Sequence, residues 1–293
     1  MNKQVIAVSG KNGQLGWELQ RLSSNYPNHQ FIFCDRSELD ITNHDQVAAF
    51  FKEHQPNFFI NTAAYTAVDK AETDQENSYK ANAEAVGNIA MLCKEFDTTF
   101  ITFSTDYVFN GDGTAPYKEN EATEPINYYG YTKEAGEKLA LANWEKTIII
   151  RTSWVYSSHG HNFVKTMLRL MNERTDLNVV NDQVGSPTYA KDLAEAVMNM
   201  IGQGANKYGI YHYSNEGVIS WFDFAAEIAK VSNSKCNVHP IPTEQFPTPA
   251  KRPKYSVLGK DRIQEDYHIQ LIDWKISLEN CITAISGKEK SGS

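Results

Sequence analysis

Short apolar runs alternate with longer amphipathic stretches through the first half of the chain. The apolar runs have the length of strands, and the stretches between them repeat apolar residues at helical spacing. The run TIIIRT at 147–152 does not alternate between apolar and polar residues, which is typical of a strand covered on both faces. The predicted strands are 4–9, 30–34, 58–61, 99–104 and 147–152, and the predicted helices are one that ends near residue 23, 45–53, 76–96 and 131–143.

The second half of the chain has longer loops and a cluster of prolines between residues 240 and 253. Two predicted helices, 162–172 and 221–231, stand among irregular segments. Strands that alternate with helices form βαβ units and a parallel sheet with right-handed crossovers. We therefore predict an α/β fold, with a doubly wound parallel sheet and a smaller C-terminal α/β lobe that is able to return strands to the sheet. The polar end, 287–293, is predicted to be a disordered tail.

Composition and charge exclude several classes of protein. A chain of 293 residues is long enough to bury a large core, and its formal net charge of −8 argues against a nucleic-acid partner. The four cysteines lack the spacing of a metal site, and no apolar run is long enough for a membrane span. We expect a cytoplasmic protein, monomeric or homodimeric, that binds neither nucleic acid nor a membrane.

A glycine-rich loop, GKNGQLG at 10–16, follows the first strand and opens the first helix. Its glycines permit a tight turn and a close approach to a pyrophosphate, while the helix N-terminus offers free N–H groups to the anion. This strand–turn–helix context is the one that the dinucleotide-binding motif requires. We therefore predict a Rossmann-type NAD(P)-binding domain over residues 1–156 and a mainly substrate-binding lobe over 157–286. The loop residues expected to contact the cofactor are Gly10, Asn12, Gly13, Gln14, Leu15 and Gly16.

The choice between NADH and NADPH depends on the end of the second strand. Asp35 stands where an acidic side chain would hold a ribose 2′-hydroxyl, whereas Arg36 and Lys11 would pair with the 2′-phosphate of NADP. Because these signals conflict, we expect both cofactors to be accepted, with NADPH slightly preferred. Asp40 and Ile41 follow and would line the adenine.

Tyr129 and Lys133 stand four residues apart in the segment YGYTK, so they share one face if the segment is helical. A lysine beside a tyrosine lowers the phenol pKa from about 10, which suits the phenol to exchange a proton with a carbonyl or alcohol oxygen. An exposed ion-pairing face is the ordinary alternative explanation of this spacing. Thr105 ends a predicted strand at the edge where open sheets bind ligands, and its hydroxyl would hold the reacting oxygen or cap the strand. We predict that Tyr129, Lys133 and Thr105 are catalytic.

Together these segments resemble the extended short-chain dehydrogenase/reductase family. The resemblance extends from the glycine loop to about residue 258. Besides the segments above, it rests on NTAAYTAVD at 61–69, STDYVF at 104–109, RTSWVY at 151–156, DQVGSPT at 182–188 and RPKYSVL at 252–258.

The resemblance implies further contacts. It places NAD(P) contacts at Asp35, Asp40, Ile41, Ala63, Ala64, Tyr65, Thr66, Tyr129 and Lys133, and substrate contacts at Thr105, Asp106 and Trp154. The flat ring of Trp154 would stack on a sugar or belong to the core. Val68 is a further candidate for the substrate pocket. Arg252 would pair with a substrate diphosphate or be solvated on the surface.

The resemblance also implies a reaction, which is NAD(P)H-dependent reduction of the C4 keto group of dTDP-4-dehydro-L-rhamnose to dTDP-L-rhamnose, for cell-surface polysaccharide. The alternatives are a reductase or epimerase acting on another nucleotide-linked 4-keto sugar, or a non-catalytic NADP-binding regulatory subunit. A dehydratase is disfavoured because Asp106 is followed by Tyr107 and not by glutamate.

Metal binding is possible at one family position. Some family members are magnesium-bridged dimers, and Glu18 matches one of the ligand positions, but Lys191 replaces another carboxylate. We therefore doubt a Mg²⁺ site. His159 and His161 are predicted to lie in a solvated loop, because no third zinc ligand is near them in sequence.

Overall fold

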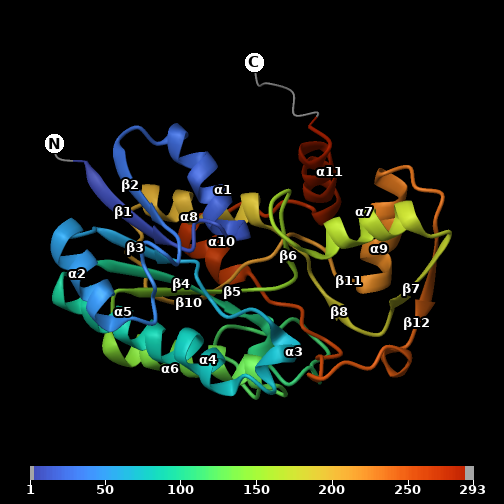
Figure 1. Cartoon of the computed structure of the whole chain (residues 1–293), viewed down its shortest axis with the longest axis horizontal. Coiled ribbons are helices and arrows are strands. Elements are labelled where there is room, and N and C mark those ends of the chain that lie inside the picture. The colour runs from blue at the N-terminus through green and yellow to red at the C-terminus, as the bar shows by residue number, and fades with distance from the viewer. Residues whose placement is uncertain (1–2, 288–293) are drawn as a thin grey trace.

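The computed structural model describes residues 3–287. At its centre, the described residues form a six-stranded sheet with the strand order β10-β5-β4-β3-β1-β2, in which every pairing is parallel. The strands are β1 (Gln4–Ser9), β2 (His29–Cys34), β3 (Phe58–Asn61), β4 (Thr99–Thr105), β5 (Thr147–Thr152) and β10 (Gly209–His212). The chain leaves β1 for β2 on one side and then crosses to β3 on the other, so the winding reverses at β1 (Figure 1).

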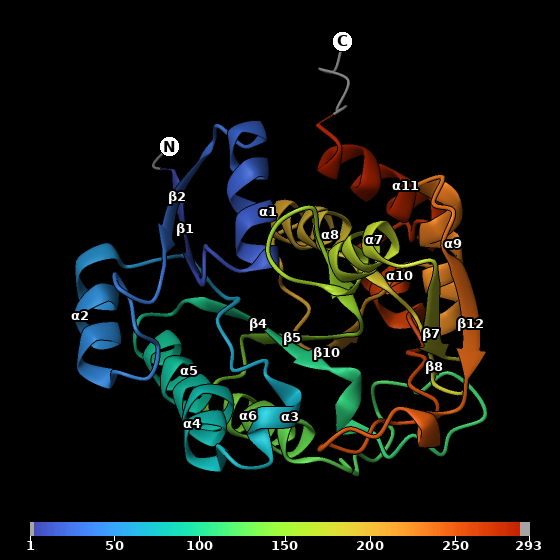
Figure 2. The same cartoon turned by 45° about the vertical axis from the view of Figure 1, so that its right-hand side comes forward.

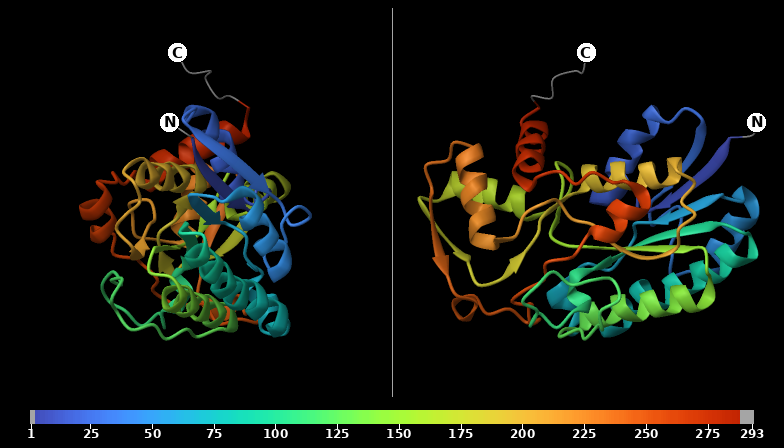
Figure 3. Two further views of the ribbon diagram at one scale, coloured as in Figure 1. Left: turned by 90° about the vertical axis from the view of Figure 1, so that its left-hand side faces the viewer. Right: turned by 180° about the vertical axis from the view of Figure 1, so that it is seen from behind.

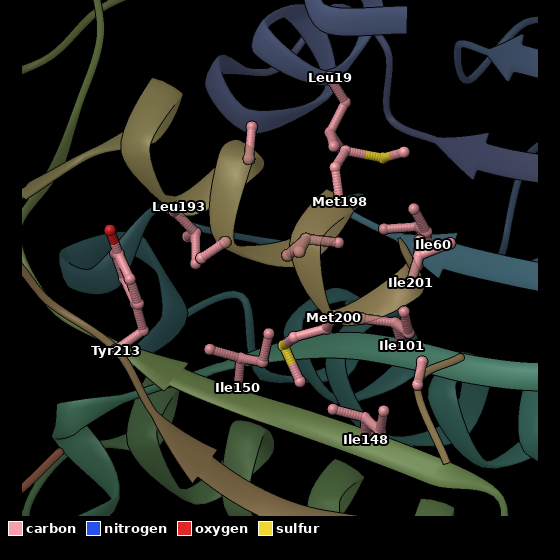
Figure 4. Packing of buried hydrophobic residues seen from close by; sticks show 14 of the residues in the cluster. Leu19, Ile60, Ile101, Ile148, Ile150, Leu193, Met198, Met200, Ile201 and Tyr213 are labelled. Atoms are coloured by element: carbon pink, nitrogen blue, oxygen red, sulfur yellow. The ribbon is translucent and has the colours of Figure 1, made fainter. Parts of the chain in front are cut away.

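Helices cover both faces of this sheet. One face packs against α1 (Gln14–Leu22), α8 (Ala190–Gly202) and α10 (Asp261–Tyr267), and the other against α2 (His44–His54), α5 (Ala85–Glu95) and α6 (Tyr128–Asn143) (Figure 3). Ile148 and Ile150 of β5 point into the core under α8 (Figure 4), while Ile149 between them belongs to the opposite core. Since both faces are apolar and covered, the strand sequences need not alternate.

Two predicted helices differ from those in the structure. The predicted helix 76–96 consists of α4 (Gln75–Tyr79), a π-helical turn (Lys80–Glu84) and α5. The predicted helix 131–143 begins three residues earlier, at Tyr128, because the Asn127 side chain accepts a hydrogen bond from Gly130 N at 2.8 Å and caps it. Tyr129 therefore lies in the first turn of α6.

The remaining elements lie beside the carboxyl ends of the central strands (Figure 2). They surround a separate core that contains Tyr156, Val164, Phe224 and Trp274. These elements are β6 (Val155–Tyr156), α7 (Phe163–Glu173), β7 (Asp176–Val180), β8 (Val184–Gly185), β9 (Thr188–Tyr189), β11 (Ile219–Ser220), α9 (Trp221–Val231), β12 (Asn237–Ile241) and α11 (Trp274–Ile285). Two short helices, α3 (Val68–Ala71) and the 3-10 helix Asp106–Val108, flank the same edge of the sheet, and further 3-10 turns are Ser23–Asn25 and Thr243–Gln245.

The second half of the chain contributes to both parts of the molecule. β10 joins the central sheet, and α8 and α10 pack on it, although all three come from residues 157–286. The domain boundary near residue 156 stays a prediction. No helix between residues 3 and 287 is long and apolar enough to cross a lipid bilayer. Of the predicted tail, 288–293 lie outside the described residues.

Candidate active site

A cleft of about 970 Å³ opens at the carboxyl ends of β1, β3 and β4. It lies at the reversal of winding beside β1, which is where open α/β sheets bind their ligands. Most of the residues predicted to contact a cofactor line it, together with two of the three predicted catalytic residues. These are Gly10, Asn12, Gly13, Gln14, Leu15, Arg36, Asp40, Ile41, Ala63, Ala64, Tyr65, Thr66, Tyr129 and Lys133.

The glycine loop is shaped to receive a phosphate. Gly10 has a φ of +78°, and a Cβ there would lie 2.8 Å from Ala63 N, so a side chain at this position would strain the turn and meet β3. A Cβ on Gly16 would collide with the Gly10 carbonyl, which explains why Gly16 packs behind the loop and not in the cleft wall. Gly13 caps α1 without a side-chain hydrogen bond, and the first turn holds no acidic residue. The N-terminus of α1 is therefore suited to a cofactor diphosphate.

The acidic end of β2 does not face the cleft. Asp35 Oδ1 accepts hydrogen bonds from Ser37 Oγ at 2.6 Å and Ser37 N at 2.9 Å, and these bonds lower the pKa of Asp35 to about 2. Lys11 Nζ lies 2.5 Å from Glu38 Oε2 and 3.6 Å from Asp35 Oδ2, so its charge is balanced. Arg36, whose side chain is 84% exposed, lines the cleft and contacts only the Asp40 carboxylate, at 3.4 Å, among the charged groups described. Arg36 and Lys11 were both predicted to bind the 2′-phosphate of NADP. Of the two, Arg36 is the better placed, because it lines the cleft.

The three predicted catalytic residues come together at the junction of β4 and α6. Thr105 ends β4, and its hydroxyl interacts with the phenol of Tyr129. The Tyr129 ring stands edge-on to Tyr107, with ring centroids 6.0 Å apart. A Cβ on Gly130 would collide with the Tyr107 carbonyl, so the glycine lets α6 approach the end of β4 closely. Lys133 is buried one turn further along α6 and lines the same cleft.

The pKa values differ from the sequence-based expectation. Loss of water around the Tyr129 phenol raises its pKa, the Asp106 charge raises it further, and the Thr105 hydroxyl acts in the opposite direction. Burial lowers the pKa of Lys133 to about 8, against the charge of Glu137, which raises it. The structure therefore does not show the predicted lowering of the phenol pKa, because burial of the Tyr129 phenol is the largest effect on it. A protonated phenol is the form that donates a proton.

Two buried polar atoms beside the catalytic residues lack a hydrogen-bond partner within residues 3–287. They are Ser104 Oγ, which lines the cleft, and Asp106 Oδ2. Burial raises the pKa of Asp106 to about 6. Unpaired buried polar atoms are costly, so a ligand that hydrogen-bonds to Ser104 Oγ would be favoured in this cleft. The glycine loop and Ser104 Oγ together fit a dinucleotide and a polar substrate.

The other predicted substrate residues lie outside the residues that line this cleft. Trp154 follows β5 with a φ of +47° and stacks on Trp221, with ring centroids 3.6 Å apart. Val68 begins α3. Arg252 is neither solvated nor free, because its guanidinium binds both carboxylate oxygens of Asp69, at 2.6 and 2.9 Å.

The sequence profile of the RmlD substrate binding domain family matches residues 4–286. The chain belongs to this family. It is 40% identical to the dTDP-4-dehydrorhamnose reductase of Aggregatibacter actinomycetemcomitans over 286 residues, which cover 94% of this chain and 97% of that protein.

Two solved structures are similar over nearly their whole length. The crystal structure of a dTDP-4-dehydrorhamnose reductase from Clostridium acetobutylicum superposes with a TM-score of 0.93 at 41% identity, covering 97% of this chain and 100% of the other. The dTDP-4-dehydrorhamnose reductase of Bacillus anthracis, solved in complex with NADP, gives a TM-score of 0.93 at 40% identity, covering 96% and 99%. The α/β Rossmann-type fold predicted from the sequence is confirmed.

In this member of the RmlD family, several cleft residues were not predicted. Lys70, Lys80, Gly160 and His161 line the cleft, as does Ser104. His159, predicted to be solvated, instead stacks on Trp17 with ring centroids 4.8 Å apart. The sequence offers no signal for Lys70, Lys80, Gly160 and His161, since they reach the cleft only through the packing of distant segments. Ser104 stands beside Thr105 at the end of a predicted strand, so the signal that identified Thr105 applies to it as well.

Among residues 3–287, no three His, Cys, Asp or Glu side chains gather as metal ligands would. Glu18, the position that matches a magnesium ligand in some relatives, is buried and accepts a hydrogen bond from Ser157 Oγ at 2.7 Å.

Proposed function

We propose that this chain is an NADPH-dependent oxidoreductase that reduces the C4 keto group of dTDP-4-dehydro-L-rhamnose to dTDP-L-rhamnose. The observation that carries the proposal is that Tyr129 and Lys133 line a cleft together with the glycine loop, while the Thr105 hydroxyl interacts with the Tyr129 phenol. The names and the near-complete coverage of its relatives support the choice of substrate. The proposal includes a cytoplasmic enzyme, monomeric or homodimeric, whose substrate-binding lobe is built mainly from residues 157–286.

The cleft offers a distinct contact to each part of the cofactor. The glycine loop and the N-terminus of α1 would hold the diphosphate, Asp40 and Ile41 the adenosine, and Lys133 the nicotinamide ribose. Arg36 would pair with the 2′-phosphate, which favours NADPH over NADH. When bound, the cofactor supplies the hydride that reduces C4.

The residues at the end of β4 handle the oxygen and the proton. Tyr129 keeps its phenolic proton in the buried site and donates it to the C4 oxygen. The Thr105 hydroxyl, which donates to Asp106 Oδ1 at 3.1 Å, would turn its proton to the C4 oxygen and so orient it. The ammonium of Lys133 stabilises the phenolate that remains after proton transfer. Ser104 Oγ, which lines the cleft, would bind a hydroxyl group of the sugar.

The direct test is the loss of NADPH absorbance when the protein is given dTDP-4-dehydro-L-rhamnose generated from dTDP-glucose by the preceding dehydratase and epimerase. Rapid loss, with dTDP-L-rhamnose identified as the product, supports the reaction and the substrate together. A protein that binds NADPH but oxidises none with this sugar would overturn the proposal. Turnover without added NADPH would instead identify an epimerase.

A further inference from the structure

The segment 157–162 (SSHGHN), between β6 and α7, forms an additional wall of the cofactor cleft. Its residues Gly160 and His161 line the cleft together with Gly13, Gln14 and Leu15 of the phosphate loop. Gly160 has a φ of +74°, and a Cβ at this position would lie 3.4 Å from Gln14 Cγ. In Figure 2 the yellow-green loop that leads into α7 passes beside α1. The segment therefore lies next to the place where a cofactor diphosphate would sit.

Hydrogen bonds hold this segment against the phosphate loop. Asn162 Nδ2 donates to Gln14 Oε1 at 3.0 Å, and Gln14 Nε2 donates to the Val155 carbonyl at 3.3 Å. Asn162 also caps α7, because its Oδ1 accepts from Lys165 N at 3.1 Å. The Asn162 side chain thus connects the phosphate loop to the first turn of α7. These hydrogen bonds hold segment 157–162 in one conformation that does not depend on a bound ligand.

An aromatic contact fixes the middle of the segment. The His159 ring stacks on Trp17 of α1 with an angle of 8° between the rings, and its Nε2 lies 3.1 Å from the Asn12 carbonyl oxygen. The next residues, Gly160 and His161, are consequently held at the rim of the cleft. His161 is exposed, and it makes no hydrogen bond or ion pair with any residue between 3 and 287.

The charged side chains around the phosphate loop determine which cation can pair with a cofactor diphosphate. The charge of Lys11 is balanced by Glu38 and Asp35, so the loop itself presents no uncompensated cation to a diphosphate. Arg36 and Lys133 line the cleft but belong to the ends proposed for the 2′-phosphate and the nicotinamide ribose. Lys70 and Lys80 also line it, from α3 and the π-helical turn after α4, and Lys70 pairs with Asp74 Oδ2 at 3.2 Å. His161 follows Gly160, which packs on Gln14, and its imidazole is the group of this segment in the cleft lining that can carry a positive charge.

We propose that segment 157–162 is a preformed clamp on the cofactor diphosphate, in which the imidazolium of His161 pairs with the diphosphate at the N-terminus of α1. The proposal deepens the proposed function and rests on it for the identity of the ligand as a dinucleotide. The Gln14–Asn162 hydrogen bond holds the clamp in place.

The charge of His161 makes binding of the diphosphate depend on pH. The charged and titratable groups on the elements around the segment are Glu18 and Arg21 on α1, Lys11 in the phosphate loop, Tyr156 on β6, Lys165, Arg169 and Glu173 on α7, and His159 in the segment itself. Of these, only His159 is, like His161, an imidazole. The difference between the wild type and a His161 variant therefore isolates the effect of His161.

The test is calorimetric measurement of the dissociation constant for ADP-ribose, at pH 6 and pH 8. ADP-ribose has the diphosphate but neither a nicotinamide nor a titrating 2′-phosphate. We expect His161→Gln to raise the dissociation constant for ADP-ribose about three- to fivefold at pH 6 and less at pH 8. The effect is modest because solvent weakens an exposed ion pair. His161→Lys should bind as tightly as the wild type at pH 6 and more tightly at pH 8, since its charge persists. His239→Gln, an exposed histidine in β12, is the matched control and should leave binding unchanged.

Equal affinity of the wild type and His161→Gln for ADP-ribose at pH 6 would overturn the clamp, as would His161→Lys binding like His161→Gln. Binding of 2′,5′-ADP, which has a 2′-phosphate but only a monophosphate at the 5′ position, should respond less to His161→Gln than binding of ADP-ribose. An equal response would also count against a diphosphate contact. If ADP-ribose binding depends on His161 but no keto sugar is reduced, the proposed reaction fails and the clamp stands.

Discussion

At the residue scale, burial decides the protonation of the two principal catalytic candidates. Tyr129 and Lys133 both lose water at the base of the cleft, so the pKa of the phenol rises and that of the ammonium falls to about 8. Each shift favours the neutral form, because a low-dielectric site penalises charge of either sign. The site therefore holds a protonated phenol that can donate its proton, together with the Lys133 amine, which changes charge near pH 8.

Tyr129→Phe tests the proton donor. We expect turnover with the keto sugar to fall about a hundredfold or more, since the C4 oxygen loses its acid. The ring and its packing on Tyr107 are kept, so the dissociation constant for NADPH should change by less than about threefold. Stopped-flow turnover and fluorescence titration measure the two quantities. Near-wild-type turnover would remove Tyr129 from the mechanism.

The pH profile tests Lys133. If the ammonium is the active form, kcat/KM falls as pH rises through about 8, because the lysine loses its proton there. The negative charge of Glu137 raises the pKa of Lys133, so Glu137→Gln should lower this pKa and move the basic limb of the profile to lower pH. Glu134→Gln, on the same helix but bonded to Lys138 and Thr123, is the control and should leave the limb in place.

Glu137 also binds Arg151 through two hydrogen bonds, of 2.9 and 2.7 Å, in the core. Urea unfolding of Glu137→Gln must therefore accompany the pH profile, since loss of a buried charge partner is destabilising. A folded Glu137→Gln enzyme with an unmoved basic limb would contradict the role given to this carboxylate.

Arg36→Ala tests cofactor choice. We expect the dissociation constant for NADPH to rise about tenfold, because the 2′-phosphate loses its cation, while that for NADH stays within about twofold. Calorimetry with both cofactors measures the difference. A parallel loss for both would place the arginine elsewhere on the adenosine.

At the element scale, the start of α6 determines where the catalytic tyrosine lies. Asn127 Oδ1 caps the helix at Gly130 N, and its Nδ2 donates to the Lys251 carbonyl at 2.9 Å. The helix therefore includes Tyr128 and Tyr129, which the apolar pattern alone does not assign to it. Gly130 then lets this first turn lie directly against the residues that follow β4.

Asn127→Ala removes the cap. We expect the free energy of unfolding to fall by about 1 kcal/mol, the usual cost of losing an asparagine cap, whereas Asn127→Ser should recover part of it. Urea denaturation of the three proteins measures this. Equal loss in both variants would assign the stabilisation to the Lys251 contact, which serine is too short to reproduce.

At the scale of the whole molecule, side chains from distant segments connect the two parts that border the cleft. Arg252, near the end of the proline-rich stretch, pairs with Asp69 at the start of α3, and Asp69 also accepts a hydrogen bond from Ala250 N at 3.1 Å. Asp182 similarly accepts from Thr243 Oγ1 at 2.7 Å. The stretch from Thr243 to Arg252 is thus attached at both ends, once to each part of the molecule.

The predicted contact of Arg252 with a substrate diphosphate can be tested against this pairing. Arg252→Ala should raise the KM for the sugar nucleotide about tenfold, and leave the dissociation constant for NADPH unchanged. Asp69→Ala loses the same ion pair but keeps the arginine, so it should raise the KM less. Equal effects in steady-state kinetics would show that the ion pair, and not a substrate contact, is what matters.

The sequence by itself determined the layered fold and much of the cleft. Covered strands are apolar on both faces, so β1, β3 and β5 were predicted with their observed bounds. The glycine loop, read with the strand before it and the helix after it, indicated where the cleft lies. The tertiary structure alone decided the rest. Protonation of Tyr129 and Lys133 depends on burial, the pairing of Arg252 depends on a residue 183 positions away, and His161 reaches the cleft only because 157–162 packs on the phosphate loop. The sequence pattern shows which segments are apolar. Loss of water around a side chain and contacts between distant residues arise only when the segments pack together.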